Sequence, residues 1–208
     1  YIYSIEKEKL KFVSKKKINV MSLVRNKSDY LIGTKNNGLF KLDNRYKNIN
    51  KIDVFTGGYP IRVITKDKNG DFLVGTDGAG IYHLNNDYKL LGHYSHSEDN
   101  LLSLSSNGVY DIIVDNQEIT WVATYGGGVN FLDKSKSVFK KIKHKLNTDN
   151  SLKNSFTRAI EVDAFGRLWF GTKNGVSIFD PETKDWSHIK NLDDIVMALE
   201  RDGNSMWV

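Results

Sequence analysis

The sequence predicts an all-β fold built from repeated four-stranded antiparallel units, and two observations predict it. The first is a recurring segment in which two apolar residues precede a Gly-Thr or Ala-Thr pair. Its copies are Leu31-Ile32-Gly33-Thr34, Leu73-Val74-Gly75-Thr76, Trp121-Val122-Ala123-Thr124 and Trp169-Phe170-Gly171-Thr172, and Trp207-Val208 begins a fifth. The first residues of these copies are 42, 48, 48 and 38 residues apart. A period in this range is typical of a repeat architecture.

The second observation is a set of short β-prone runs inside each repeat. In the third copy they span residues 109–115, 119–124, 129–133 and 138–142, and Gly, Asn, Asp or Lys bounds each of them. Such runs are typical of strands, and four antiparallel strands make one blade of a β-propeller. The predicted first strands of the blades are 18–24, 61–66, 109–115, 157–163 and 195–200.

The third and fourth copies match at an offset of 48 residues, as the pairs Ser103 and Ser151, Ile112 and Ile160, and Trp121 and Trp169 illustrate. The tryptophans occupy one repeat position, where an aromatic side chain is expected to pack between neighbouring blades. Trp186, in contrast, is expected on an outer fourth strand. The repeat positions expected to be structural are Gly33, Thr34, Gly75, Thr76, Trp121, Thr124, Trp169, Gly171, Thr172 and Trp207.

The composition excludes several classes of protein. The chain has no cysteine, which rules out disulfides, and no apolar run long enough to span a membrane. The net charge is +5, but the lysines are scattered, and the dense run Lys15-Lys16-Lys17 falls in a connection between strands. No nucleic-acid-binding motif accompanies this charge, so nucleic acid is not an expected partner of this segment.

Motifs for metal or catalytic chemistry are weak. The glycines between second and third strands, such as Gly126-Gly127-Gly128, suit tight turns, and no Gly-Lys-Ser/Thr follows them. Asp67-Lys68-Asn69-Gly70-Asp71 is too short for a calcium loop and is interpreted as a hairpin turn. The cluster His93-Tyr94-Ser95-His96-Ser97-Glu98-Asp99 is interpreted as a polar loop. The prediction is no catalytic residue, no metal and no cofactor.

One segment carries a family resemblance. The pattern Ile-x-x-Asp-x-x-Gly-x-Leu-Trp-Phe-Gly-Thr-x-x-Gly-Val-x-x-Phe-Asp-Pro, written here from Ile160 to Pro181, follows Asn150-Ser151-Leu152. Together they resemble the two-component regulator propeller repeat. The first two copies depart from the pattern, because Leu31 and Leu73 replace the tryptophan.

The resemblance implies a function. Such repeats build the extracytoplasmic sensor part of hybrid two-component histidine kinases, which commonly regulate polysaccharide utilisation. It therefore implies a periplasmic, ligand-sensing segment that responds to oligosaccharides and is not itself an enzyme. The kinase domains would belong to the rest of a membrane-bound parent chain, and the expected partners are a small ligand, further blades and domains of the parent, and a second copy in a homodimer. The alternative is a secreted or periplasmic propeller enzyme, such as a lyase, a lactonase or a glycan-active enzyme.

Blade geometry suggests where a ligand would bind. The connections leading into the first strands share one face with the turns between second and third strands, and sites on propellers are usually built from such loops. Side chains there that could stack on a sugar or bind its hydroxyl groups are Tyr59, Arg62, Tyr125, Arg158 and Lys173.

The division into repeats leaves partial blades at both ends. The whole chain, 1–208, is expected to form one propeller segment with repeats at about 14–56, 57–104, 105–152 and 153–190, a partial repeat at 191–208, and the end of a preceding blade at 1–13. Joined, the two partial blades would close a five-bladed ring. The family resemblance instead implies seven blades, so the favoured interpretation is a fragment of a seven-bladed propeller, with five-bladed closure as the alternative.

Overall fold

The computed structural model describes residues 2–4, 9–11, 18–27, 29–46, 48–54, 57–133 and 138–208. These residues form strands, turns and loops, with no helix among them. No helix in the described part of the chain could therefore cross a membrane. The lysine run at 15–17 lies outside the described residues.

Four sheets of four antiparallel strands make up most of the chain, and in each the strands are ordered as in the sequence. Blade I contains β3 (Val20–Asn26), β4 (Asp29–Thr34), β5 (Leu39–Leu42) and β6 (Ile49–Ile52). Blade II contains β7 (Ile61–Lys66), β8 (Phe72–Thr76), β9 (Gly80–Leu84) and β10 (Leu90–Tyr94). Blade III contains β11 (Val109–Val114), β12 (Thr120–Thr124), β13 (Gly128–Asp133) and β14 (Val138–Ile142). Blade IV contains β15 (Thr157–Val162), β16 (Leu168–Thr172), β17 (Gly175–Phe179) and β18 (Trp186–His188).

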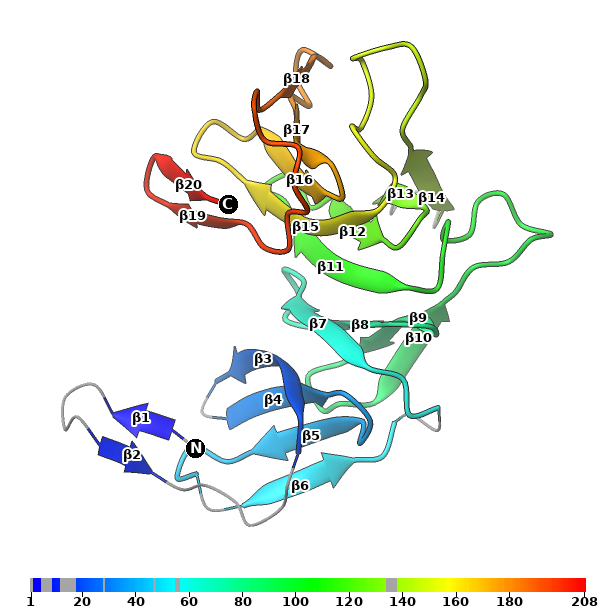
Figure 1. The fold of residues 1–208 in the computed structure, drawn as a ribbon. Coiled ribbons are helices and arrows are strands. Elements are labelled where there is room, and N and C mark those ends of the chain that lie inside the picture. Colours follow the sequence, from blue (N-terminus) through cyan, green and yellow to red (C-terminus); the bar gives the residue numbers. More distant parts are fainter. Residues whose placement is uncertain are drawn as a thin grey trace.

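The predicted all-β fold of four-stranded blades is confirmed. The blades follow one another in an arc, with the first strands β3, β7, β11 and β15 on its concave side and the fourth strands outside (Figure 1). The first strands of neighbouring blades are in contact. The first strand of blade I begins and ends two residues later than predicted, at Val20 and Asn26.

Two hairpins flank the blades. One joins β1 (Ile2–Ser4) to β2 (Lys9–Lys11), and the other joins β19 (Glu200–Asp202) to β20 (Ser205–Trp207). Each forms a two-stranded sheet of its own, with Tyr3 paired to Leu10 and Trp207 paired to Glu200. The composite blade that five-bladed closure requires is therefore not formed, and the number of blades in a complete ring stays a prediction.

The first strand predicted at 195–200 is wrong. Only Glu200–Asp202 form a strand there, because the partner β20 offers three residues for pairing. The preceding segment lies against blade IV instead: Val196 donates a backbone hydrogen bond to Thr172, and Val196 and Leu199 are buried beside Val176.

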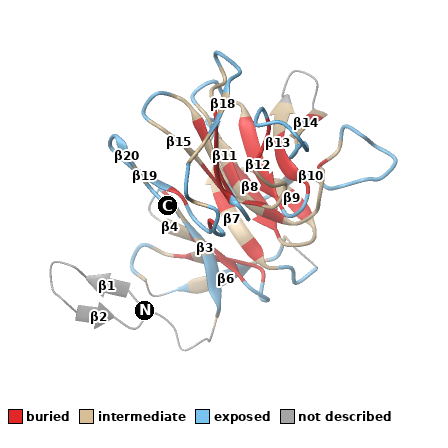
Figure 2. Cartoon of the chain, turned by 45° about the horizontal axis from the view of Figure 1, so that its top comes forward, coloured by how far each residue is buried: buried red, intermediate tan, exposed pale blue. Residues whose placement is uncertain are grey.

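The hydrophobic core lies between the blades, and Figure 2 shows the buried residues along their strands. One cluster joins Leu31 of blade I to Ile61 and Phe72 of blade II. The next joins Leu73 of blade II to Val109 of blade III, and a third joins Trp121 of blade III to Phe170 of blade IV. Each blade is therefore stabilised by its neighbours, as expected for a repeat protein.

Glycine in the Gly-Thr pair lets adjacent blades approach closely. A Cβ on Gly33 would lie 2.5 Å from Cγ2 of Ile61, which begins the first strand of the next blade. On Gly75 it would lie 2.7 Å from Cγ1 of Val109, again in the next blade. Atoms cannot approach this closely without displacement, so glycine is required here by packing and not by its backbone angles.

The threonine that follows closes the turn between second and third strands. Thr34, Thr76, Thr124 and Thr172 are all buried, and each hydroxyl donates to the carbonyl of a glycine three or four residues later, at 2.7–2.9 Å. The acceptor glycines have positive φ angles, as the sequence predicts for this turn. The repeated Gly-Thr pair thus combines a blade contact with a turn closure.

The tryptophans divide into two groups. Trp121 is 2% exposed and packs against blade IV, and its Nε1 donates to Asp115 at 2.8 Å. Trp169 is partly buried and makes the same bond to Asp163 at 2.9 Å. Trp207 is 66% exposed on β20, so the predicted packing between blades is not found there. Trp186 lies on the fourth strand β18 as predicted and contacts the ring of Phe179.

The hairpin turn predicted at 67–71 is confirmed. Asp67 and Asp71 are joined by a backbone hydrogen bond, and Asp67 Oδ1 accepts from the backbone of Asn69 and Asp71. Asp115 and Asp163 accept the corresponding bonds in blades III and IV.

Replacing Gly75 with alanine should destabilise the chain by about 1–3 kcal/mol, because the new methyl group would overlap Val63 and Val109. Urea unfolding measures this. The control is Gly92→Ala, because a Cβ on Gly92 meets nothing within 4 Å. Equal stability of the two variants would contradict the close blade contact.

Trp121→Ala should cost ~3–5 kcal/mol of unfolding free energy, because a large side chain is removed from the interface between blades III and IV. The same change at the exposed Trp207 should stay within ~0.5 kcal/mol. Thermal or urea unfolding compares them, and a near-neutral Trp121→Ala would remove the packing role of the repeated aromatic.

Candidate functional site

A β-bulge at the start of each first strand creates the candidate site. The register shifts between residues 61 and 63, 109 and 111, and 157 and 159. The residues that fall out of register are Arg62, Tyr110 and Arg158, at the same position of blades II, III and IV. Because a bulge redirects the side chain of the extra residue, it can present these groups outside the regular ladder.

Tyr110 lies between the two arginines. The Cζ atom of Arg62 is 4.8 Å from the centre of the Tyr110 ring, and that of Arg158 is 5.6 Å from it. Both distances are within the range of cation–π attraction. Three blades therefore supply one continuous stack of side chains.

Tyr125 extends the stack from the turn that follows β12. Its ring is 5.6 Å from that of Tyr110 in a stacked arrangement and 4.8 Å from that of Phe156 in an edge-to-face one. Its residue is 47% exposed, so part of this aromatic surface is open to solvent. An exposed ring that its neighbours hold in place suits stacking on a ligand.

Asp77 fixes one end of the stack. Its Oδ2 accepts from Arg62 Nη2 at 2.6 Å and from Nε at 3.1 Å, and the Tyr110 hydroxyl donates to the same atom at 3.5 Å. Burial raises the pKa of Tyr110, and the negative charge of Asp77 adds to this effect. Tyr110 is therefore a neutral donor at physiological pH.

Arg158 is less completely satisfied than Arg62. Its Nε is buried and has no hydrogen-bond partner among the described residues. Unpaired buried donors are uncommon, since each costs free energy unless water or a ligand accepts from it. Arg158 is therefore the member of the stack with donor capacity to spare.

The five predicted ligand-binding residues lie at this end of the blades. The structure brings Arg62, Tyr125 and Arg158 together around Tyr110. Lys173 lies 5.8 Å from the centre of the Phe156 ring, at the edge of the stack. Tyr59, 46% exposed, covers Gly78, next to Asp77. Whether any of them binds a ligand stays a prediction.

Three members of the cluster were not predicted, namely Tyr110, Asp77 and Phe156. A signal for Tyr110 exists in the sequence, because it lies 48 residues after Arg62 and 48 before Arg158. Asp77 and Phe156 carry no comparable pattern, and only their positions at the turn and the strand connection bring them in.

A hollow of about 360 Å³ lies at the opposite end of the first strands. Its lining includes Lys66, Asp115, Glu161, Asp163 and Arg201. Asp115 and Asp163 are already bonded to tryptophan indoles, so these carboxylates serve the fold. The stack around Tyr110 is the better candidate for binding.

The histidines of the predicted polar loop have structural partners. His93 Nε2 donates to the carbonyl of Ala79 at 2.6 Å, and His96 Nδ1 donates to that of Leu104 at 2.7 Å. His144, 48 residues after His96, makes the same bond to Leu152. These rings therefore position the connections between blades.

Comparison with known proteins places this geometry in context. Residues 151–174 match the family model described as two component regulator propeller. The chain carries a two component regulator propeller repeat. The match falls on the segment that resembles this family in the sequence, and so confirms the resemblance. The comparison with curated proteins gives no match.

Several solved structures share the fold. The extracellular domain of BT3049 from B. thetaiotaomicron, described as a hybrid two component system, superposes with a TM-score of 0.75 at 22% identity; the match covers 91% of this chain and 27% of that one. Streptogramin B lyase gives 0.66 at 17% identity, covering 90% and 61%. A chain of the mitotic checkpoint complex gives 0.71 at 12% identity, covering 95% and 59%. At these identities the likeness establishes the β-propeller fold alone.

Asp111, next to Tyr110, ties blade III to blade IV. Its Oδ2 accepts from the backbone of Ile160 and its Oδ1 from that of Ile112, both at 2.9 Å. Burial raises the pKa of this carboxyl to about 6 from an ordinary 3.8, although the two backbone hydrogen bonds favour the charged form. This bond helps set the spacing between Tyr110 and Arg158.

A pH dependence of stability follows. Between pH 3.8 and about 6 the folded chain keeps a proton on Asp111 that the unfolded chain has released. The contribution of this group to the unfolding free energy therefore falls as pH rises through that window. Urea unfolding from pH 3.5 to 7 should show the stability of Asp111→Asn increasing relative to the parent chain over the same window. A constant difference would contradict the raised pKa.

Proposed function

We propose that this chain is a ligand-binding segment of the extracytoplasmic sensor region of a hybrid two-component system, and that its ligand is an oligosaccharide. The observation that carries the proposal is the stack of Arg62, Tyr110 and Arg158, which draws one side chain from each of three blades. The repeat match at 151–174 supports the sensor assignment.

The chemistry of the stack suits a sugar. Exposed faces of Tyr125 and Tyr59 offer flat apolar surfaces for the carbon–hydrogen face of a pyranose ring. The arginines donate hydrogen bonds in a fixed plane, and sugar hydroxyl groups can accept them. Binding here would contact several blades at once and so could be transmitted through their contacts.

The remaining parts of this proposal concern the whole protein. The chain spans about a quarter of the length of the BT3049 extracellular domain and about three-fifths of the lyase chain. A periplasmic location, further blades, a membrane anchor and a histidine kinase core that controls polysaccharide utilisation are proposed for the parent by similarity. In that assignment this segment binds its ligand and does not transform it.

Binding is tested by titrating a panel of neutral and acidic oligosaccharides into the chain in a calorimeter. Arg158→Ala and Tyr125→Ala should each weaken the affinity at least about tenfold, a loss of roughly 1.4 kcal/mol, because a donor and a stacking surface are removed. Phe165→Ala is the control, since this 76% exposed ring lies in the turn at the opposite end of β15.

Unchanged affinity in both site variants would place the ligand elsewhere. A panel in which nothing binds, or in which a glycan is cleaved, would contradict the proposed role. Circular dichroism of each variant confirms that a loss of binding is not a loss of fold.

A further inference from the structure

Blade II differs from blades III and IV at the turn between its first two strands. In blades III and IV the turn aspartate accepts a hydrogen bond from a tryptophan indole on the second strand. The equivalent residue of blade II is Leu73, which has no donor. The Asp67 carboxylate therefore lacks the partner that its counterparts have.

The surrounding positions also differ in blade II. In blade III, Ile119 precedes the second strand and Phe131 pairs with Trp121. In blade IV, Arg167 occupies the first of these positions and bonds the turn aspartate at 2.7 Å. Blade II has Asp71 and His83 there, and His83 pairs with Leu73 across the sheet. An apolar or cationic environment is thus replaced by a second carboxylate and an imidazole.

The carboxylate of blade IV shows what such a group normally needs. Burial raises the pKa of Asp163, but hydrogen bonds from Trp169, Arg167 and the backbone outweigh it, and the net pKa lies below its ordinary value. Asp67 has only the turn amides in common with it. Among the described residues no lysine or arginine forms an ion pair with Asp67 or Asp71.

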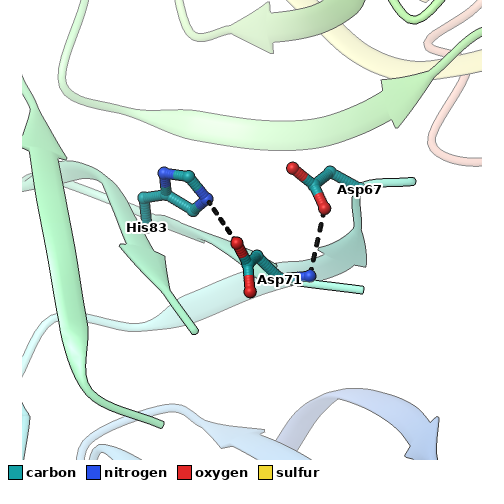
Figure 3. Close-up of side chains that lie close together, drawn as sticks. All are labelled: Asp67, Asp71 and His83. Atoms are coloured by element: carbon teal, nitrogen blue, oxygen red, sulfur yellow. Dashed lines mark hydrogen bonds and ion pairs between the residues drawn. The ribbon is translucent and has the colours of Figure 1, made fainter. Parts of the chain in front are cut away.

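The three side chains of blade II converge (Figure 3). One ligand atom from each of Asp67, Asp71 and His83 lies within 4.8 Å of the other two, and His83 Nε2 is 3.9 Å from Asp71 Oδ2. That nitrogen is buried and has no hydrogen-bond partner among the described residues. It points toward the carboxylates, and both side chains of this pair keep about a fifth of their surface exposed, so an ion can reach them.

We propose that Asp67, Asp71 and His83 form a binding site for a divalent transition-metal ion such as Zn²⁺. Zinc binds imidazole nitrogen and carboxylate oxygen at ~2.0–2.2 Å, which places tetrahedral ligand atoms ~3.4 Å apart. Shifts of the side chains by less than about 1.5 Å would bring the three atoms to that spacing. Imidazole favours zinc over magnesium or calcium, which prefer oxygen ligands alone.

The ion would tie the turn after β7 to the third strand β9. Three protein ligands leave one coordination position for water or for a group of another molecule. The site lies at the opposite end of the first strands from the stack around Tyr110, and it is independent of the proposed oligosaccharide binding.

Calorimetric titration of ZnCl₂ into the EDTA-treated, dialysed chain tests the proposal. We expect one ion per chain, and at least about a tenfold loss of affinity in His83→Phe and in Asp67→Asn. Phenylalanine is the residue that blade III carries at the position of His83, so the sheet can accommodate it. His93→Gln, which alters a histidine bonded to Ala79, should bind zinc as the parent chain does.

A second measurement needs no variant of the site. Zinc should shift the ring ¹⁵N resonances of one histidine, which the spectrum of His83→Phe identifies as His83. Zinc binding that depends on His93 and not on His83, no binding to the parent chain, or equal affinity in all variants would each overturn the proposal.

Discussion

The close approach of each first strand to the second strand of the preceding blade is the contact on which the rest of the structure depends. Glycine at residues 33 and 75 leaves room for Ile61 and Val109, and the hydrophobic clusters form around these contacts. Polar bonds reinforce the same junctions: Ser22 donates to the carbonyl of Ile61, Thr65 to that of Ile112, and Asp111 accepts from Ile160. Each sheet alone would expose an apolar face, so the blades are stable only together.

This constraint also explains how a binding site can be built from one residue per blade. Arg62, Tyr110 and Arg158 occupy the same bulge in three sheets, and the spacing of the blades brings them within cation–π distance. The fold leaves these positions free to vary because their side chains leave the ladder at the bulge. The turns at the other end vary in the same way, which is how blade II acquires two carboxylates and an imidazole.

Much of the fold is predictable from the sequence because its period is written in residues with local roles. The Gly-Thr pair, the turn aspartates and the alternation of β11 locate three strands of a blade without any long-range information. The failures have long-range causes. The strand at 195–200 requires a partner of equal length, Trp207 requires a neighbouring surface, and the convergence of His83 on Asp67 depends on cross-strand pairing. Tyr110 was predictable from the offset of 48 residues, but only once Arg62 and Arg158 were recognised as equivalent positions.

Hydrogen exchange of the backbone amides, followed by mass spectrometry, tests most directly whether contacts between blades make the four sheets one cooperative unit. The account predicts that amides of β7, β8, β11, β12, β15 and β16 exchange with the same, highest opening free energy, because no blade can open without exposing its neighbours. Opening free energies that differ from blade to blade, with one sheet exchanging while the next stays protected, would contradict it.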